Sequence, residues 1–97
     1  MTTSAASRKT RIASRLQAAF SPRILEVRDE SERHRGHAGW REGGETHFAV
    51  RLVSDRFQGL SRLARHRLVH EALGPDLIAE IHALQLSLLT PDEAADG

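Results

Sequence analysis

Residues 45–67, ETHFAVRLVSDRFQGLSRLARHR, decide the fold, because a strand, a turn and a helix follow one another there without a gap. Large apolar side chains occupy every second position between residues 46 and 53, which is the period of a strand that packs one face against a core. These are Phe48, Val50 and Leu52, and they alternate with His47, Ala49 and Arg51. Ser54 and Asp55 then end the predicted strand.

The period changes after Gly59 to that of a helix with two contrasting stripes. The apolar stripe, expected to face the core, consists of Leu60, Ala64, Leu68 and Ala72, which fall four residues apart. Arg62, His66 and His70 form a second stripe on roughly the opposite side. Ser61 stands near the start of this helix, and Gly74-Pro75 is a stop signal. The central unit is therefore a strand that leads into a basic, solvent-facing helix.

The segments on either side supply further elements. Residues 8–20 are typical of an amphipathic helix that ends at Ser21-Pro22, and residues 24–29 of a short strand. Residues 31–44 contain four glycines and no regular period, which predicts a long loop between two strands. One helical turn is expected over residues 75–80, whereas residues 82–89 suit either a strand or a helix. Residues 90–93, TPDE, have the spacing of a capping box, which indicates a short terminal helix.

Composition limits the classes of protein that remain. With 97 residues, 39% hydrophobic and 28% charged, the chain is expected to form one globular domain. We expect a domain over residues 8–93 between disordered tails at 1–7 and 94–97. No apolar run is long enough for a membrane span, and the amino terminus lacks the apolar region of a secretory signal, so we expect a cytoplasmic protein with no membrane partner.

Charge and cysteine content add two constraints. The net charge is only +1, but residues 1–28 carry a basic cluster opposed by Glu26 alone. That end is either a footprint for a polyanion or an ordinary solvated helix face. Its basic residues are Arg8, Lys9, Arg11, Arg15, Arg23 and Arg28. The absence of cysteine excludes disulfides, a cysteine nucleophile and a self-contained thiolate metal site.

Three separated motifs carry a resemblance to a known family. The run THFAVRLVSDRFQGLSRLARHRLV, together with IHAL at 81–84 and LEVRDES at 25–31, closely resembles the BolA family of small α/β proteins. The resemblance implies a type II KH-like fold, in which a three-stranded mixed sheet has its helices packed on one face. The implied order is helix, strand, strand, helix, short helix, strand and a short carboxyl-terminal helix. It also makes residues 82–89 a strand.

Six histidines in a chain without cysteine are the main candidates for chemistry, because imidazole binds iron, zinc or copper. His66 and His70 are four apart and could share a metal, but without a third ligand nearby an exposed stripe is the simpler interpretation. His47 is interpreted as structural, since strand pairing explains it adequately.

The resemblance implies a role for other histidines. In proteins similar to BolA, a histidine near the start of the last strand and a loop residue can ligate a [2Fe–2S] cluster shared with a monothiol (CGFS-type) glutaredoxin and glutathione. The IHAL motif places the first ligand at His82, and the loop ligand falls at His34, with His37 as the alternative. Imidazoles can replace two cysteines in such a cluster, as in Rieske centres. The isolated chain is then expected to carry no cofactor and to be a monomer or a weak homodimer.

A second function competes, namely a DNA-binding transcriptional regulator. Phe57 to Val69 is expected to expose a basic group that could contact phosphates. The group consists of Arg62, Arg65, His66 and Arg67. The GxxG loop of KH domains is absent, and aromatic residues for base stacking are few. No spacing marks an acid, a base and a nucleophile together, so we expect no enzymatic activity.

Overall fold

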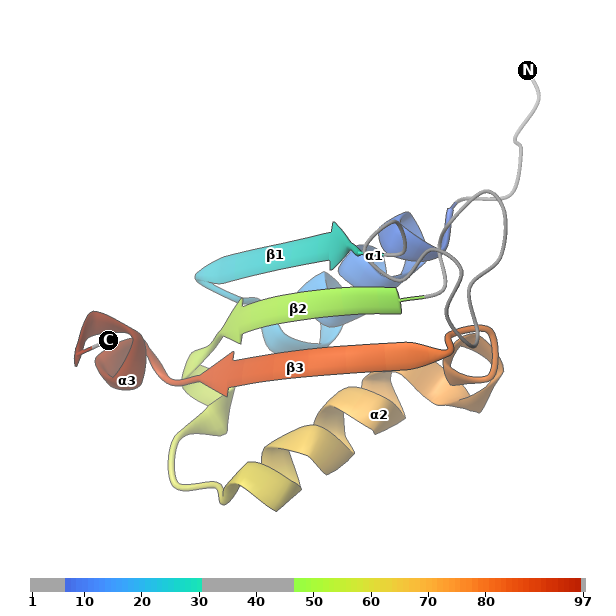
Figure 1. The fold of residues 1–97 in the computed structure, drawn as a ribbon. Coiled ribbons are helices and arrows are strands. Elements are labelled where there is room, and N and C mark those ends of the chain that lie inside the picture. Colours follow the sequence, from blue (N-terminus) through green and yellow to red (C-terminus); the bar gives the residue numbers. More distant parts are fainter. Residues whose placement is uncertain (1–6, 31–46, 97) are drawn as a thin grey trace.

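The computed structural model describes residues 7–30 and 47–96. Along the chain the elements are α1 (Arg8–Phe20), β1 (Ile24–Asp29), β2 (His47–Val53), the 3-10 turn η2 (Asp55–Phe57), α2 (Arg62–Ile78), β3 (Ala83–Leu89) and α3 (Pro91–Asp96) (Figure 1). The predicted order of elements is confirmed, and residues 83–89 form a strand. The terminal helix continues to Asp96, further than the sequence pattern suggests.

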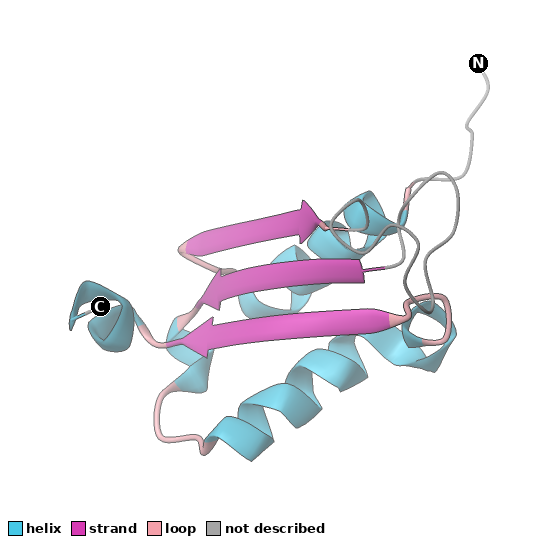
Figure 2. Ribbon diagram, viewed as in Figure 1, coloured by secondary structure: helices cyan, strands magenta, loops and turns pink. Residues whose placement is uncertain are grey.

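The sheet is mixed and has the order β1-β2-β3. β1 pairs with β2 in the antiparallel direction, with Leu25 opposite Leu52, and β2 pairs with β3 in the parallel direction, with Val50 opposite Leu86. Helices α1 and α2 both lie on one face of this sheet (Figure 2). The predicted fold class, a small α/β domain with its helices on one face, is therefore confirmed.

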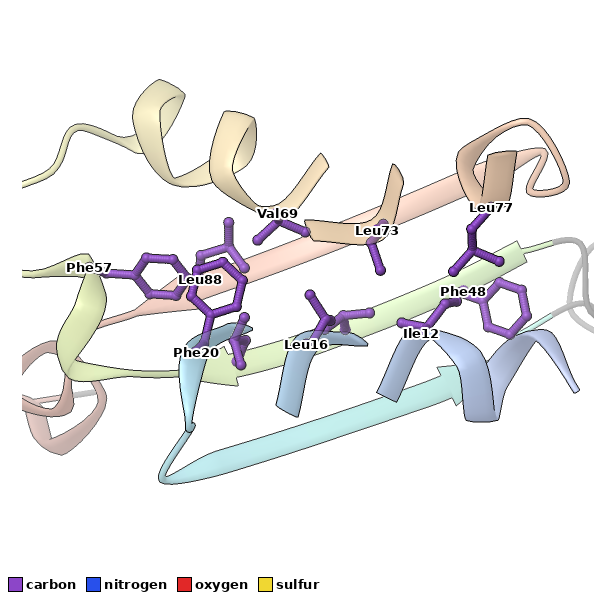
Figure 3. Packing of buried hydrophobic residues seen from close by; sticks show 11 residues of the cluster. Ile12, Leu16, Phe20, Phe48, Phe57, Val69, Leu73, Leu77 and Leu88 are labelled. Carbon is purple, nitrogen blue, oxygen red and sulfur yellow. The ribbon is translucent and has the colours of Figure 1, made fainter. Parts of the chain in front are cut away.

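The core lies between the two helices and the sheet, as Figure 3 shows. The predicted alternation of β2 is confirmed from Phe48 to Leu52, because Phe48, Val50 and Leu52 are buried while Ala49 and Arg51 are only half-buried. His47, predicted on the side of Ala49 and Arg51, is buried as well. The other buried apolar residues of this cluster are Ile12, Leu16, Phe20, Phe57, Val69, Leu73, Leu77 and Leu88.

The buried stripe of α2 differs by one residue from the predicted stripe. Arg65, Val69, Leu73 and Leu77 face the core. The predicted apolar stripe reaches only the margin of the core, since its members Leu60, Leu68 and Ala72 are partly buried. The sequence pattern missed the buried stripe because its first residue is an arginine, and a charged side chain is seldom buried unless its charge is paired.

Local signals set the ends of the helices much as expected. The Ser61 hydroxyl accepts a hydrogen bond from the Ala64 N–H at 3.1 Å, which caps α2. Gly74 interrupts the same helix with φ 84° and ψ 150°, a backbone conformation that is essentially restricted to glycine. The predicted stop at Gly74-Pro75 is thus a break within α2, and the helical turn that follows it ends at Ile78. The capping box before α3 is confirmed, since the Thr90 N–H donates to Glu93 Oε1 at 2.9 Å and the Glu93 N–H donates to Thr90 Oγ1 at 3.2 Å.

Candidate metal-ligand site at one edge of the sheet

The end of β1 and the starts of β2 and β3 lie together at one edge of the sheet, across the ends of the strands (Figure 1). Asp29 lies opposite Phe48 in the first pair of strands, and His47 lies opposite Ala83 in the second. The Glu30 N–H donates to the His47 carbonyl at 2.8 Å, which extends the pairing of β1 and β2 by one further bond. The segment 31–46 is covalently attached at this edge on both sides, through Glu30 and His47.

His82 lies at the same edge, directly before β3, and its side chain is exposed. Two consecutive turn hydrogen bonds lead the chain into this position, from the Glu80 N–H to the Leu77 carbonyl at 3.0 Å and from the Ile81 N–H to the Ile78 carbonyl at 3.1 Å. An imidazole here is accessible to a ligand from outside the chain, whereas an imidazole enclosed in the core would not be.

His47 contacts His82. The two ring centroids are 5.0 Å apart and the ring planes are tilted by 52°. His47 is 5% exposed, so a buried imidazole lies beside an exposed one. The pattern of the sequence did not indicate this contact, because the two residues are far apart in the chain and His82 precedes its strand. Only the parallel register of β2 with β3 brings them together.

The other predicted histidines do not extend this site within the structure. His34 and His37 lie outside the described residues, so the choice between them stays a prediction. In α2, Nδ1 of His66 lies 2.8 Å from the Arg62 carbonyl oxygen, a contact within the helix itself. Among residues 7–30 and 47–96, no group of three or more His, Cys, Asp or Glu side chains is placed to hold a metal ion. Any metal held through His82 therefore needs further ligands from residues beyond these ranges or from another molecule.

The position of Arg65 in the structure differs from the prediction that it belongs to an exposed basic surface. It is 7% exposed, and the expectation that it lies on an exposed face is wrong. Its guanidinium donates to the Leu60 carbonyl at 3.1 Å and to the Leu88 carbonyl at 3.0 Å, and it forms a bidentate pair with Glu93 at 2.6 and 3.1 Å. This pairing makes burial of the charge tolerable. Arg65 thereby joins α2, β3 and α3.

Glu93 shows the electrostatic consequence of that pairing. The hydrogen bond from Arg65, followed by the bond from the Thr90 N–H, lowers the pKa of the Glu93 carboxyl to about 2 from its ordinary 4.5. The carboxylate therefore stays ionised well below neutral pH. The capping box was visible in the sequence, but the partner of its glutamate was not.

Three arginines of the basic amino-terminal region form ion pairs with acidic residues that follow the break in α2. Arg8 and Arg11 both contact Glu80, at 3.2 and 2.8 Å, and Arg15 pairs with Asp76 at 3.3 Å and also donates to the Leu73 carbonyl. Hydrogen bonds from these arginines lower the pKa of Glu80 and of Asp76, and the bond with Glu80 raises the pKa of Arg11. Lys9 and Arg28 are exposed and form no ion pair with the described residues, so only part of the predicted polyanion footprint is neutralised.

Other cations lie at the surface of the described residues, on the turn η2 and on α2. Arg23 pairs with Asp55 at 3.2 Å. In α2, Arg62 and Arg67 are exposed, and neither forms an ion pair with the part of the chain that the structure describes. Within that part, no helix is both long and apolar enough to cross a membrane.

Comparison with known proteins identifies the family to which this chain is similar. The family model described as BolA-like protein matches residues 16–93. BolA-like protein 1 of Mus musculus is 50% identical over 80 residues, which cover 82% of this chain and 56% of the mouse protein. The chain thus spans little more than half the length of that relative. The DNA-binding transcriptional regulator BolA of Escherichia coli is 47% identical over 85 residues, which cover 88% of this chain and 77% of the regulator.

A solved structure agrees with the fold. The BolA domain of SufE1 from Arabidopsis thaliana superposes with a TM-score of 0.77 at 43% identity, over 93% of this chain and 99% of that domain.

Proposed function

The chain belongs to the BolA-like protein family, and on this premise we propose that it is an adaptor that pairs with a monothiol glutaredoxin and lends imidazole nitrogen to a shared [2Fe–2S] cluster. Its role would lie in iron–sulfur cluster trafficking or iron-linked regulation. When bound, the cluster would supply transferable iron and sulfide, or a signal sensitive to iron and redox state. This chain would supply ligands and a docking surface, with no catalytic step of its own.

The exposed imidazole of His82 is the observation that carries the proposal. It lies at the edge of the sheet where residues 31–46 join the described part of the chain. A histidine of that segment is therefore tethered by the backbone to the same edge as His82. Both halves of a two-histidine ligand set therefore start from one end of the sheet. An imidazole at position 82 enclosed by α1 and α2 would have excluded this role.

The donor atoms that the chain offers fit a [2Fe–2S] cluster shared with a partner. The chain has no cysteine, so it would offer nitrogen and leave the thiolates to the glutaredoxin and glutathione. A [2Fe–2S] cluster accepts two histidines in place of two cysteines.

The loop ligand is proposed to be His34, with His37 as the alternative. His34 follows Glu30 by four residues, and an extended chain advances about 3.3–3.6 Å per residue, so His34 can lie up to about 14 Å from Glu30. His37 has a longer reach. Chain length alone therefore permits either residue to approach His82, and mutation has to distinguish them.

A titration tests the proposal. The purified chain is added to a cluster-loaded monothiol glutaredoxin, and visible circular dichroism reports any change in the cluster environment. His82→Ala should abolish the change, while His70→Ala, at an exposed position of α2, serves as the matched histidine control. His34→Ala should weaken the change more than His37→Ala. The opposite ranking would reassign the loop ligand to His37.

A DNA-binding regulator is the second candidate, and the Escherichia coli relative, itself a DNA-binding transcriptional regulator, favours it. The burial of Arg65 reduces the candidate surface to Arg62, His66 and Arg67. Affinity for duplex DNA should then fall as salt rises and fall further with Arg67→Ala. An affinity that responds to neither change would remove this candidate.

A further inference from the structure

We propose that His47 is a positioning residue, whose buried ring holds the exposed ring of His82 in one orientation and so prepares it for ligation. The inference rests on the proposed function only where a cluster is concerned, because the order of the His82 side chain can be measured in the free protein. Strand pairing explains the position of the His47 backbone. It does not explain why its imidazole is buried against a second imidazole.

The backbone of His47 is fixed from both sides. It begins the central strand of the sheet, its carbonyl accepts the Glu30 N–H at 2.8 Å, and its Cα is in register with Ala83 of β3. The side chain is 5% exposed. A ring with a paired backbone and almost no access to solvent has little freedom to change rotamer, so it forms a stable surface for a neighbour.

His82 has the opposite surroundings. It precedes β3, follows a turn and is exposed, and among residues 7–30 and 47–96 the ring of His47 is the side chain known to contact it. The 5.0 Å separation and 52° tilt from His47 fall within the range in which aromatic rings pack favourably. Contact with a fixed ring therefore selects among the orientations of His82.

Preorganisation of this kind affects ligation directly. A mobile ligand loses rotamer freedom when it binds a metal, and a ligand that is already ordered loses less. Residues that orient a metal ligand typically change metal affinity by about 10- to 100-fold when they are removed. We expect the contribution of one ring contact at the lower end of that range, about 10-fold.

The first test uses the free protein. Side-chain carbon relaxation and three-bond couplings of His82 should report one dominant χ1 rotamer in the native chain. They should report rotamer averaging in His47→Ala, and restored order in His47→Phe, which keeps a ring at position 47 but removes its nitrogens. Thermal unfolding of both variants verifies that they are folded at the temperature of measurement. A His82 side chain that is equally ordered in His47→Ala, or equally averaged in the native chain, would overturn the proposal.

The second test uses the complex with a cluster-loaded monothiol glutaredoxin. Loss of the cluster to an iron chelator should be about 10-fold faster with His47→Ala and close to native with His47→Phe. Affinity for the cluster-free glutaredoxin should be the same for all three chains, because a merely structural defect would weaken that complex as well. If His82→Ala changes the cluster signal but His47→Ala leaves its lifetime unchanged, this inference fails and the proposed function survives. If His82→Ala changes nothing, the proposed function fails, whatever His47 does.

Discussion

Replacing Arg65 with methionine should destabilise the domain strongly, although the residue was expected on the surface. Arg65→Met keeps an unbranched apolar stem beside Phe57, whose ring centroid lies 5.8 Å from the guanidinium carbon. It removes the donors to the Leu60 and Leu88 carbonyls and the pair with Glu93. The mutation therefore isolates the polar contribution of the arginine from its packing.

The expected loss follows from the two carbonyl bonds. A hydrogen bond that involves a charged group contributes about 1.5–3 kcal/mol. The bond to Leu88 is buried whereas the bond to Leu60 is only part-buried and should contribute less, so we expect a total loss of about 2–4 kcal/mol. In a domain of this size each kcal/mol lowers Tm by about 4–8 °C, so Tm should fall by about 8–32 °C. Such a loss is a large part of the about 5–15 kcal/mol that stabilises a typical domain.

Urea denaturation at neutral pH, followed by far-ultraviolet circular dichroism, measures this loss. Arg67→Met is the matched control, because Arg67 is exposed on the same helix and forms no ion pair within the described ranges. It should change the free energy of unfolding by no more than about 0.5 kcal/mol. An Arg65→Met variant as stable as Arg67→Met would refute the conclusion that Arg65 serves the fold.

Three further predictions concern acid stability, a glycine and DNA. Because the pKa of Glu93 is lowered to about 2 from 4.5, its carboxylate contributes stability above about pH 4.5 that is lost as the pH falls toward 2; Glu93→Gln should flatten stability across that window, and unchanged acid unfolding would contradict the linkage. Gly74→Ala should cost about 1–3 kcal/mol, more than Gly59→Ala in the same melts. Both glycines have positive φ, but only at Gly74 would a Cβ approach Asp76 Oδ1, at 2.8 Å, and equal costs would show that crowding there is unimportant. If DNA is bound, Arg67→Ala should weaken binding more than Arg23→Ala, as measured by fluorescence anisotropy, because Arg23 is already paired with Asp55.

Much of the fold was predictable because local signals agreed with the tertiary structure. The alternation in β2 reports the buried face of the sheet directly, and the capping box before α3 is made by residues three positions apart, so the pattern contains both partners. Gly74 marks the break in α2 for a similar reason, since its positive φ is a local requirement that glycine meets without strain.

The features that were missed depend on partners far apart in the chain. Arg65 looks like a surface residue unless its pairing with Glu93 is known, and that error displaced the predicted core stripe of α2 by one residue. The contact of His47 with His82 depends on strand register and on the turn before β3, neither of which periodicity determines. The exposure of His82 could not be predicted from the sequence either, although the IHAL motif had identified the residue as a candidate ligand.

The glutaredoxin titration decides whether this protein shares a cluster through imidazole. Addition of the native chain to cluster-loaded monothiol glutaredoxin should alter the visible circular dichroism spectrum until the two proteins are equimolar. Addition of the His82→Ala chain should not change the spectrum of the cluster-loaded glutaredoxin. A spectrum that does not respond to the native chain, or that responds equally to His82→Ala, would contradict the proposed ligation.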